Sequence, residues 1–507
     1  MKRKNDFSRN FGQQKPKSQY LKMMRSFSFR SFQFLLIFLI VFLSSFQAGC
    51  LLFPKKTPPL DVIFANADAK PGKRPIIIIP GILGTELINK QTEEKVWFSR
   101  SVAETDSLAL PISPKLETNA DSLIPTRIME KAKVFKFFPE VEIYDALIKA
   151  IKIYGGYKEG DWNNPPENGF QDTYYVFAYD WRKDNVENAR LLIRKIENLK
   201  KKLNRNNLKF NVLAHSMGGL IVRYAAMYGD KDLPQRVEDI NPDWSGAKHF
   251  NKIFMFGTPN KGSMGAFVGF FEGYYVKTLT GKIEFPNLSP EVLFSFPSLF
   301  QLLPSPDTAK FYDENLQPLE IDLYNPATWK KYGWGVLSNP KALKKLTGNN
   351  EDSESQMKEI DKYLETVLHR ALMFHKALDA ETSPPSGLLF FVFGSDCSKT
   401  LDGVIIRKNK KTNKWFVFYK TKGYKTSDGK KIEPEQIKKI LFSPGDGRVT
   451  RQSLLARNLF TNLSVKRFAP NFINFFCEEH GDLVNNKIVQ NNFLTALLFE
   501  KLEESNF

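Results

Sequence analysis

The chain has 507 residues, of which 42% are hydrophobic and 13% aromatic, and its formal net charge is +18 at pH 7. This length and composition indicate a globular core, either one large domain with insertions or two to three ordinary domains. The basic balance suits anionic membranes and phosphates. It would also suit nucleic acid, but the chain lacks the basic-aromatic motifs of nucleic-acid modules, so we expect no nucleic-acid partner.

The N-terminal segment, residues 1–49, is predicted to be a signal peptide. It carries nine Lys and Arg residues and one Asp, and then the apolar run Phe32–Phe46, which is too short to span a bilayer comfortably. Ala48–Cys50 resembles a bacterial lipobox, which would make Cys50 a diacylated N-terminus, and an uncleaved anchor is the alternative. We expect residues 50–73 to form a tether and the protein to be exported and held at a membrane surface.

The first core strand is predicted at Ile76–Ile79, and the loop Pro80–Thr85 (P-G-I-L-G-T) follows it. The two glycines of the loop permit a main chain whose N–H groups point at a ligand. In a serine hydrolase such a loop supplies one donor of the oxyanion hole, the pair of N–H groups that binds the negatively charged oxygen of the intermediate. We expect Ile82 to be that donor, with Leu83 as the neighbouring alternative.

An insertion, residues 86–171, separates this strand from the next one, predicted at Tyr174–Ala178. The second strand leads into the motif Tyr179-Asp180-Trp181-Arg182, at the end of the sheet where ligands bind in α/β proteins. Two roles fit the motif equally well: a partly buried Asp180–Arg182 ion pair that braces the hinge of the cap, or direct contact with the headgroup of a lipid substrate in a pocket. Among the aromatic residues of the insertion are Trp97, Phe135, Phe137 and Phe138.

The remaining elements alternate between strand and helix, which predicts a mostly parallel sheet covered by helices on both faces. Residues 74–262 and 385–507 are expected to form the core, and residues 263–384 a cap that covers an apolar trough. Val404–Arg407 and Lys414–Tyr419 are expected to form an added hairpin. The other predicted strands are Lys209–Leu213, Lys252–Phe256 and Leu388–Phe393, and the predicted helices are Asn185–Arg205, Met217–Tyr228 and Asp352–Ala380.

The junction Phe210–Gly219 reads F-N-V-L-A-H-S-M-G-G and is typical of a nucleophile elbow. In such an elbow a serine occupies a sharp strand-to-helix turn, and small residues two positions before and after it make room. Here the serine is Ser216, with Ala214 in place of the usual glycine and Gly218 on the other side. The N–H of Met217 is the second expected oxyanion donor.

A serine hydroxyl needs a base to take its proton and a carboxylate to orient that base, and α/β-hydrolases place the acid before the histidine along the chain. Of the five histidines, only His480 lies near the C-terminus, on a loop before a final helix. His215 adjoins the serine, and His249 precedes a strand. A solvated helix face explains His369 and His375. We therefore expect His480 to be the base.

Two aspartates follow late apolar runs and are candidates for the acid. Asp446 is preferred because the flanking glycines of G-D-G let its loop turn tightly towards a histidine, and Asp396 is the alternative. Cys397 and Cys477 lie near these loops and either form a disulfide outside the cytoplasm or are small buried residues. No C-x-x-C or H-E-x-x-H spacing indicates a metal site, and we expect no cofactor.

Taken together, the ordered motifs resemble the lecithin:cholesterol acyltransferase family, which also contains phospholipid:diacylglycerol acyltransferases and lysosomal phospholipase A2. The resemblance covers roughly Lys73–Leu498. It depends on the P-G-I-L-G-T, Y-D-W-R and A-H-S-M-G-G motifs described above, on F-G-T-P-N-K-G-S, and on G-D-G-R-V and E-H-G. The early cysteine pair that holds a lid in the animal enzymes is absent, and Arg448 stands where Thr is usual.

This resemblance implies an α/β-hydrolase that transfers a fatty acyl chain from a glycerophospholipid to an alcohol (a sterol or an acylglycerol) or to water. It implies the triad Ser216, Asp446 and His480, oxyanion donors at Ile82 and Met217, and a small membrane-contacting part in the insertion 86–171. Two other hypotheses stay open: a carboxylesterase or lipase on smaller or polymeric esters, and a non-catalytic surface lipoprotein that retains the fold.

Overall fold

The computed structural model describes residues 57–66, 71–98, 107–132, 141–274, 277–278, 281–282, 288–347, 353–456 and 470–498. The chain divides into two compact units, Met1–Pro58 and Pro59–Phe507. Nearly all of the first unit lies outside the described residues, including the predicted signal peptide and Cys50. The second unit contains almost all of the described residues.

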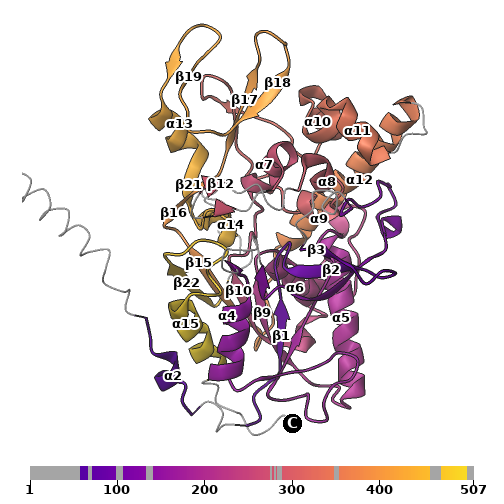
Figure 1. The fold of residues 1–507 in the computed structure, drawn as a ribbon, viewed down its shortest axis with the longest axis vertical. Coiled ribbons are helices and arrows are strands. Elements are labelled where there is room, and N and C mark those ends of the chain that lie inside the picture. The colour runs from indigo at the N-terminus through magenta and orange to yellow at the C-terminus, as the bar shows by residue number, and fades with distance from the viewer. Residues whose placement is uncertain are drawn as a thin grey trace, which may run out of the picture. The chain divides into compact units, whose positions relative to one another are not determined.

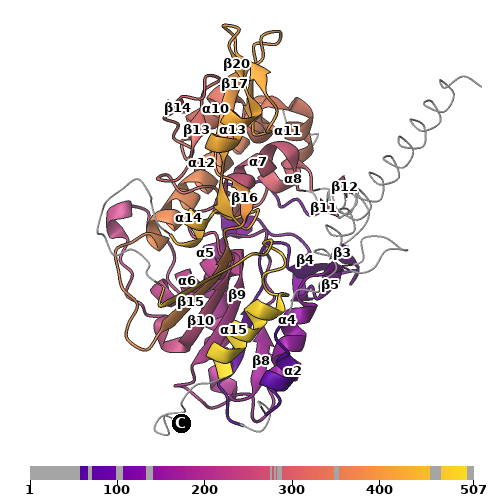
Figure 2. The same ribbon diagram turned by 90° about the vertical axis from the view of Figure 1, so that its left-hand side faces the viewer.

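A seven-stranded parallel sheet forms the centre of this second unit (Figures 1 and 2). The run of four isoleucines in β1 is completely buried because the strand has neighbours on both sides and helices over both faces. The strand order is β22 (Phe472–Phe476), β15 (Leu389–Ser395), β10 (Phe250–Phe256), β9 (Phe210–His215), β1 (Ile76–Ile79), β8 (Thr173–Val176) and β7 (Lys158–Glu159).

Helices cover the two faces of this sheet and separate two hydrophobic clusters. Ile77 and Ile79 of β1 point into the cluster that contains α5 and α6, whereas Ile76 and Ile78 point into the cluster that contains α2, α4 and α15. The predicted doubly covered sheet is therefore confirmed. The helices are α5 (Asn185–Lys202) and α6 (Met217–Tyr228) on one face, and α2 (Leu60–Ile63), α4 (Asp145–Lys149) with its π-helical continuation η2 (Ala150–Tyr154), and α15 (Lys487–Leu498) on the other.

All five predicted core strands are present, with ends that differ from the predicted ones by up to two residues. The predicted helix Asn185–Arg205 ends at Lys202, and its N-terminus is capped by the Asp184 carboxylate, which accepts hydrogen bonds from the N–H groups of Val186 and Glu187. The two edge strands, β7 and β22, were not predicted from the sequence. Phe472 and Ile473 of β22 are 49% and 36% exposed, so this strand has no continuous buried pattern.

The first insertion forms a three-stranded antiparallel sheet of β3 (Lys95–Trp97), β2 (Thr85–Asn89) and β4 (Leu123–Ile128), and a short ribbon of β5 (Lys131–Ala132) and β6 (Val141–Glu142). Trp97 is buried, so it is a core residue of this insertion. Phe135, Phe137 and Phe138 lie outside the described residues. The short helix η1 (Leu116–Thr118) belongs to the same insertion, and η3 (Val237–Asp239) and η4 (Ala247–His249) precede β10.

Residues 263–384, the predicted cap, are mainly helical. Their large aromatic side chains are buried against one another, with ring-centroid distances of 4.7–5.6 Å among Phe270, Phe300 and Trp329, so these residues form a core of their own. The elements are α7 (Met264–Glu272), β11 (Lys277–Thr278), β12 (Gly281–Lys282), α8 (Pro290–Phe294), α9 (Pro297–Phe300), β13 (Phe311–Tyr312), β14 (Pro318–Leu319), α10 (Pro326–Tyr332), η5 (Gly335–Ser338), α11 (Pro340–Thr347) and α12 (Ser353–Leu378).

A second group of strands follows β15 and joins that segment. The predicted hairpin is confirmed as β17 (Val404–Lys408) and β18 (Trp415–Phe418), and β17 also pairs with β13, so one sheet contains strands of both regions. The strand β16 (Ser398–Leu401) pairs with β21 (Phe442–Gly445). The other elements are β19 (Tyr424–Lys425), β20 (Lys431–Ile432), α13 (Pro434–Leu441) and α14 (Arg451–Leu454).

Among the described residues no helix is both long and apolar enough to cross a bilayer.

The Tyr179–Arg182 motif follows β8 and is completely or almost completely buried. The Arg182 guanidinium is 2.8 Å from the Asp180 carboxylate and 2.5 Å from that of Asp121, and it also donates to the Leu108 carbonyl. Ser298 donates to the Trp181 carbonyl, which connects the motif to α9. The motif thus joins the first insertion through an ion-pair network and residues 263–384 through a buried hydrogen bond.

Replacing Arg182 by Met should destabilise the protein by about 3–5 kcal/mol, because it leaves two carboxylates without their buried partner. The measurement is the free energy of unfolding from denaturant titration. Arg194→Met is the matched control, since Arg194 and its partner Asp230 are 49% and 46% exposed and such a pair contributes at most about 1 kcal/mol. Equal losses in the two variants would contradict this interpretation.

One histidine differs from its predicted setting, and a second, His249, precedes a strand as predicted. His375 was predicted on a solvated helix face, but it is 2% exposed because this side of α12 packs against Tyr324. Burial and the nearby Lys261 lower the pKa of His375 to about 3. His249 is also buried, and burial together with Lys200 lowers its pKa to about 4. Both histidines are therefore neutral at pH 7.

Acid should destabilise the protein through these histidines. Between the ordinary pKa of 6.5 and the lowered value, the unfolded chain binds a proton that the folded chain excludes, so the free energy of unfolding falls as the pH falls. From about pH 7 to about pH 5, His375 should account for a loss of about 2 kcal/mol. His375→Gln should lose less stability over this interval than the wild type. His369→Gln, which changes an exposed residue of the same helix, should behave like the wild type.

Candidate active site

The turn between β9 and α6 places Ser216 in a strained conformation. Its φ of 52° and ψ of −123° cost about 1–3 kcal/mol for a residue with a side chain, and such strain is concentrated at functional sites. The turn also needs the small residues around it. A Cβ at Gly218 would lie 2.6 Å from the carbonyl oxygens of Ile79 and Pro80, and one at Gly219 would lie 1.9 Å from the Thr258 hydroxyl. Only glycine fits at these two positions.

The structure brings the three residues of the predicted triad together from distant parts of the chain. His480 Nε2 is 2.9 Å from Ser216 Oγ, and His480 Nδ1 is 2.8 Å from Asp446 Oδ2. The absence of a side chain at Gly257 leaves space for His480, since a Cβ at that position would lie 3.0 Å from the imidazole ring. This arrangement lets His480 take a proton from the serine while the carboxylate fixes the orientation of the ring.

Asp446 is held as an anion in a buried position. Its other oxygen, Oδ1, accepts hydrogen bonds from the N–H groups of Arg448 and Val449. Burial by itself would raise the pKa of Asp446, but His480 and these N–H groups together lower it below its ordinary value. The alternative acid, Asp396, forms an ion pair with Arg451 at 3.4 Å instead, and the structure gives it no contact with His480.

Four aromatic side chains hold the loop Pro80–Thr85, which adjoins the serine. A Cβ at Gly81 would lie 2.9 Å from Ser216 Cβ. Among the described residues, the N–H groups of Ile82 and Met217 have no protein acceptor, so both remain available to a ligand oxygen. The contacts to the loop are Tyr179 Oη to the Pro80 carbonyl, Gly81 N–H to Tyr144 Oη, Trp97 Nε1 to the Leu83 carbonyl and Trp181 Nε1 to the Thr85 carbonyl.

Leu83 is part of this loop, and the Tyr179–Arg182 motif lies beside it. Leu83 has a φ of 65°, and its carbonyl is bonded to Trp97. Tyr179 and Trp181 support the loop, whereas Asp180 and Arg182 form the buried ion pair that was one of the two predicted roles.

A second chain of hydrogen bonds runs from the loop Pro80–Thr85 to His480. Tyr144 Oη accepts from Gly81 N–H at 2.8 Å and lies 2.8 Å from His215 Nδ1, while His215 Nε2 lies 3.2 Å from the His480 carbonyl. Since that carbonyl only accepts, the His215 proton is on Nε2, and Nδ1 accepts from the tyrosine. Burial, and then the neighbouring His480, lower the pKa of His215 to about 3, so its ring is neutral. The sequence analysis did not find this chain.

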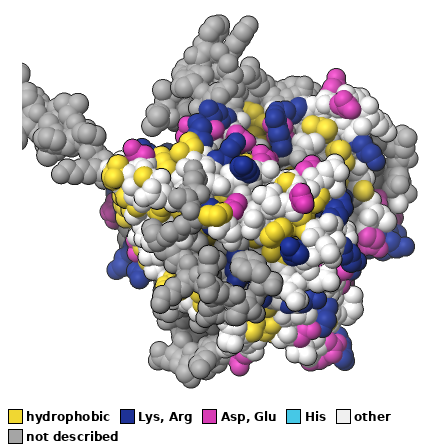
Figure 3. Space-filling view, turned by 90° about the horizontal axis from the view of Figure 1, so that it is seen from below, with side chains coloured by type: hydrophobic (Ala, Val, Ile, Leu, Met, Phe, Trp, Pro, Cys, Tyr) yellow, Lys and Arg dark blue, Asp and Glu magenta, His cyan; other side chains and the backbone are white. Residues whose placement is uncertain are grey.

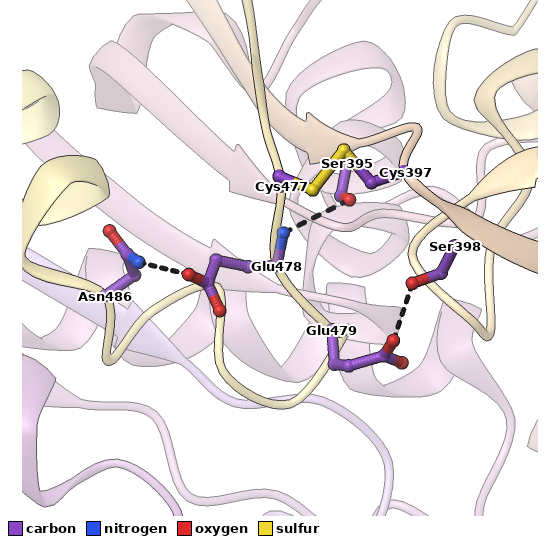
Figure 4. Close-up of a disulfide and its surroundings, with 7 residues drawn as sticks. All are labelled: Ser395, Cys397, Ser398, Cys477, Glu478, Glu479 and Asn486. Atoms are coloured by element: carbon purple, nitrogen blue, oxygen red, sulfur yellow. Dashed lines mark hydrogen bonds between the residues drawn. A yellow bond between two sulfur atoms is a disulfide. The ribbon is translucent and has the colours of Figure 1, made fainter. Parts of the chain in front are cut away.

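A disulfide between Cys397 and Cys477 connects the two loops beside the site (Figure 4). Cys397 follows β15, and Cys477 follows β22, three residues before His480. Glu478 N–H donates to Ser395 Oγ, and the Glu479 carboxylate accepts from Ser398 Oγ. The backbone that carries His480 is thus fixed to the neighbouring strand. No group of three or more His, Cys, Asp or Glu in the described part of the chain is placed to hold a metal ion.

Comparisons with known proteins indicate the family of the chain. The sequence model of the family "Lecithin:cholesterol acyltransferase" matches residues 162–456. The phospholipase A(1) LCAT3 of Arabidopsis thaliana is 25% identical over 280 residues, which cover 48% of this chain and 54% of that protein. The chain thus spans about half the length of this relative.

The crystal structure of the Tle4–Tli4 complex contains a chain with a TM-score of 0.51 and 14% identity, covering 84% of this chain and 97% of that one. EstA from Clostridium botulinum has a TM-score of 0.31 and 14% identity, covering 88% of this chain and 91% of that one. The sheet, its helices and the elbow are those of an α/β-hydrolase. Since the family match covers more than half of its length, the chain belongs to the lecithin:cholesterol acyltransferase family.

Proposed function

We propose that the protein is a serine-dependent lipid acyltransferase or phospholipase that takes a fatty acyl chain from a glycerophospholipid and forms an acyl-enzyme on Ser216. The observation that carries the proposal is the Ser216–His480–Asp446 chain, with distances of 2.9 and 2.8 Å, at a strained elbow. Membership of the family supports a lipid-modifying hydrolase or acyltransferase. The acyl donor and acceptor are part of the proposal.

In the first half of the reaction, Ser216 Oγ attacks the ester carbonyl and His480 Nε2 takes the hydroxyl proton. The N–H groups of Ile82 and Met217 bind the oxyanion that develops on the carbonyl oxygen. The ester C–O bond then breaks, the proton passes from His480 to the departing lyso-lipid oxygen, and the acyl group remains on the serine. Asp446 stabilises the imidazolium that forms between these steps.

In the second half, an alcohol or water attacks the acyl-enzyme, and the same histidine first takes and then returns a proton. A sterol or an acylglycerol is proposed as acceptor alongside water, on the basis of the family to which the chain belongs. We propose that residues 263–384 cover the acyl chain and that the first insertion contacts the membrane.

We also propose that the protein is exported and held at a membrane. The Cys397–Cys477 disulfide is typical of a protein that folds in an oxidising compartment, which supports export. Residues 1–56 lie outside the described structure, so a lipid anchor on Cys50 rests on the sequence alone.

Vesicles of mixed phospholipids that contain a sterol or diacylglycerol provide the test. The wild type should produce lyso-lipid together with free fatty acid, sterol ester or triacylglycerol, and Ser216→Ala should lower these rates by at least about 10³-fold because the nucleophile is absent. Separated and quantified product lipids are the measurement. Ester or triacylglycerol formation assigns a transferase, whereas fatty acid alone assigns a phospholipase.

The same samples decide between the proposal and its alternatives. Serine-dependent hydrolysis of short soluble esters, without any lipid product, would show that the protein is a carboxylesterase and not a lipid acyltransferase or phospholipase. If neither substrate gives a serine-dependent product, the remaining hypothesis is a non-catalytic lipoprotein. Asp446→Asn should also lose most activity, whereas Asp396→Asn should keep it. The reverse pattern would overturn the assignment of the acid.

The Tyr144–His215 chain should position the oxyanion loop relative to the base. Tyr144→Phe removes both hydrogen bonds of the hydroxyl, and we expect kcat to fall about tenfold with little change in KM, since a lost hydrogen bond of about 1.4 kcal/mol corresponds to a factor of ten. Tyr157→Phe is the control: its hydroxyl bonds the Arg74 carbonyl at the opposite end of β1. Steady-state kinetics on one ester measures both. Equal kcat values for the two variants would rule out the positioning role.

A further inference from the structure

The region between β17 and β20 carries an unusual concentration of positive charge. Residues 404–431 contain ten Lys and Arg residues and one acidic residue, Asp428. The lysines are all exposed, and we call them the lysine surface. Among the described residues, only Lys420 and Lys431 have a carboxylate within 4 Å. The lysine surface comprises Lys408, Lys410, Lys411, Lys414, Lys420, Lys422, Lys425, Lys430 and Lys431.

The β17–β18 and β19–β20 hairpins lie side by side at one end of the unit (Figures 1 and 2). In the β17–β18 turn, the Asn409 side chain accepts from the N–H groups of Lys411 and Thr412. In the β19–β20 turn, Thr426 N–H donates to the Lys430 carbonyl. Lys410 Nζ also donates to the Ser427 carbonyl, which joins the two turns. The charges are therefore displayed on one preformed surface.

Exposed aromatic side chains accompany the charge. Trp415 and Phe416 of β18 are each 38% exposed, and Lys408 lies 5.3 Å from the Trp415 ring. Arg407 lies over Tyr424 at 3.7 Å and so fixes the second turn against the first hairpin. Lysines next to exposed aromatic residues suit the headgroup region of a bilayer, where charge attracts anionic lipid and the aromatic rings enter the interface.

Protection of an edge strand is the simpler explanation of such lysines. β18 is the edge of its sheet, and lysines on an edge prevent pairing with another chain. The same need covers Lys425 and Lys431, because both strands of the two-stranded β19–β20 sheet are edges, but it does not extend to Lys410, Lys411 and Lys430, which lie in the turns. A surface that spans both turns therefore requires a further reason.

The lysine surface also lies at the end of the unit that bears the site. The carboxyl ends of the parallel strands point towards the β17–β18 hairpin in Figure 1, and β21, which follows these hairpins, leads directly into Asp446. The opposite end, seen in Figure 3, instead shows basic and acidic side chains interspersed. We propose that the lysine surface docks the protein on an anionic lipid bilayer with the active-site end facing it. The choice of lipid as the partner rests on the proposed function.

The test compares two triple variants of the full chain with the same net charge. One carries Lys411→Glu, Lys414→Glu and Lys430→Glu on the lysine surface. The other carries Lys152→Glu, Lys158→Glu and Lys201→Glu, three exposed lysines at the opposite end of the sheet. Flotation measures binding to vesicles of phosphatidylcholine alone and of phosphatidylcholine with phosphatidylglycerol. Since residues 1–56 are identical in both variants, a difference between them reports on the lysine surface.

We expect the first variant to bind anionic vesicles about a hundredfold more weakly than the wild type, because each lysine near such a surface contributes about fivefold. The second variant should lose much less, and added salt should reduce the difference. A loss no larger in the first variant than in the second would overturn the docking surface. So would unchanged vesicle binding in the first variant together with lost binding of a single-stranded RNA oligonucleotide, which would assign a nucleic-acid partner.

The variant Ser216→Ala distinguishes membrane docking from catalysis. This variant should bind anionic vesicles like the wild type, because the serine lies away from the lysine surface. If the wild type shows the expected binding pattern but forms no lipid product, the proposed function fails and the docking surface stands. If lipid products are serine-dependent but the two triple variants bind alike, the docking surface alone fails.

Discussion

The backbone of Ser216 is the constraint on which the rest of the site depends. Its φ of 52° forces the chain from β9 into α6 without an intervening loop, so the hydroxyl lies at the carboxyl end of the central strands. The groups around it come from the carboxyl ends of other strands of the same sheet. These are the loop after β1, Gly257 after β10 and His480 after β22, which lie together because parallel strands place their carboxyl ends at one edge of the sheet.

The parts of the site that were predictable from the sequence are those with a local physical cause. The elbow requires small residues at fixed offsets, and the acid loop requires glycines beside Asp446, so both leave a pattern within ten residues. The buried strands leave continuous apolar runs. Tyr144 and Asp121 could not be found in this way, because their partners Gly81, His215 and Arg182 are 61 to 71 residues away in the sequence. A lone tyrosine or aspartate gives no sign of such a contact.

Burial was the other property that the sequence left undetermined. The charged pattern of α12 indicated a solvated helix, yet His375 lies on the side that faces the protein. The short edge strand β7 was missed for a related reason, since a two-residue strand has no periodicity. Pairing of β13 with β17 likewise depends on segments about 90 residues apart, and it makes one sheet from two regions that look independent along the chain.

The Cys397–Cys477 disulfide has a consequence for the integrity of the chain. The two cysteines are 80 residues apart, and the hairpins with their lysines lie between them. Exposed lysines in turns are where a trypsin-like protease cuts most readily. A single cut there would break the polypeptide inside a covalently closed ring, so both fragments would remain joined through sulfur. Ser216, which lies on the fragment before the cut, would then stay in one molecule with Asp446 and His480, which lie on the fragment after it, although the peptide chain between β15 and β22 was no longer continuous.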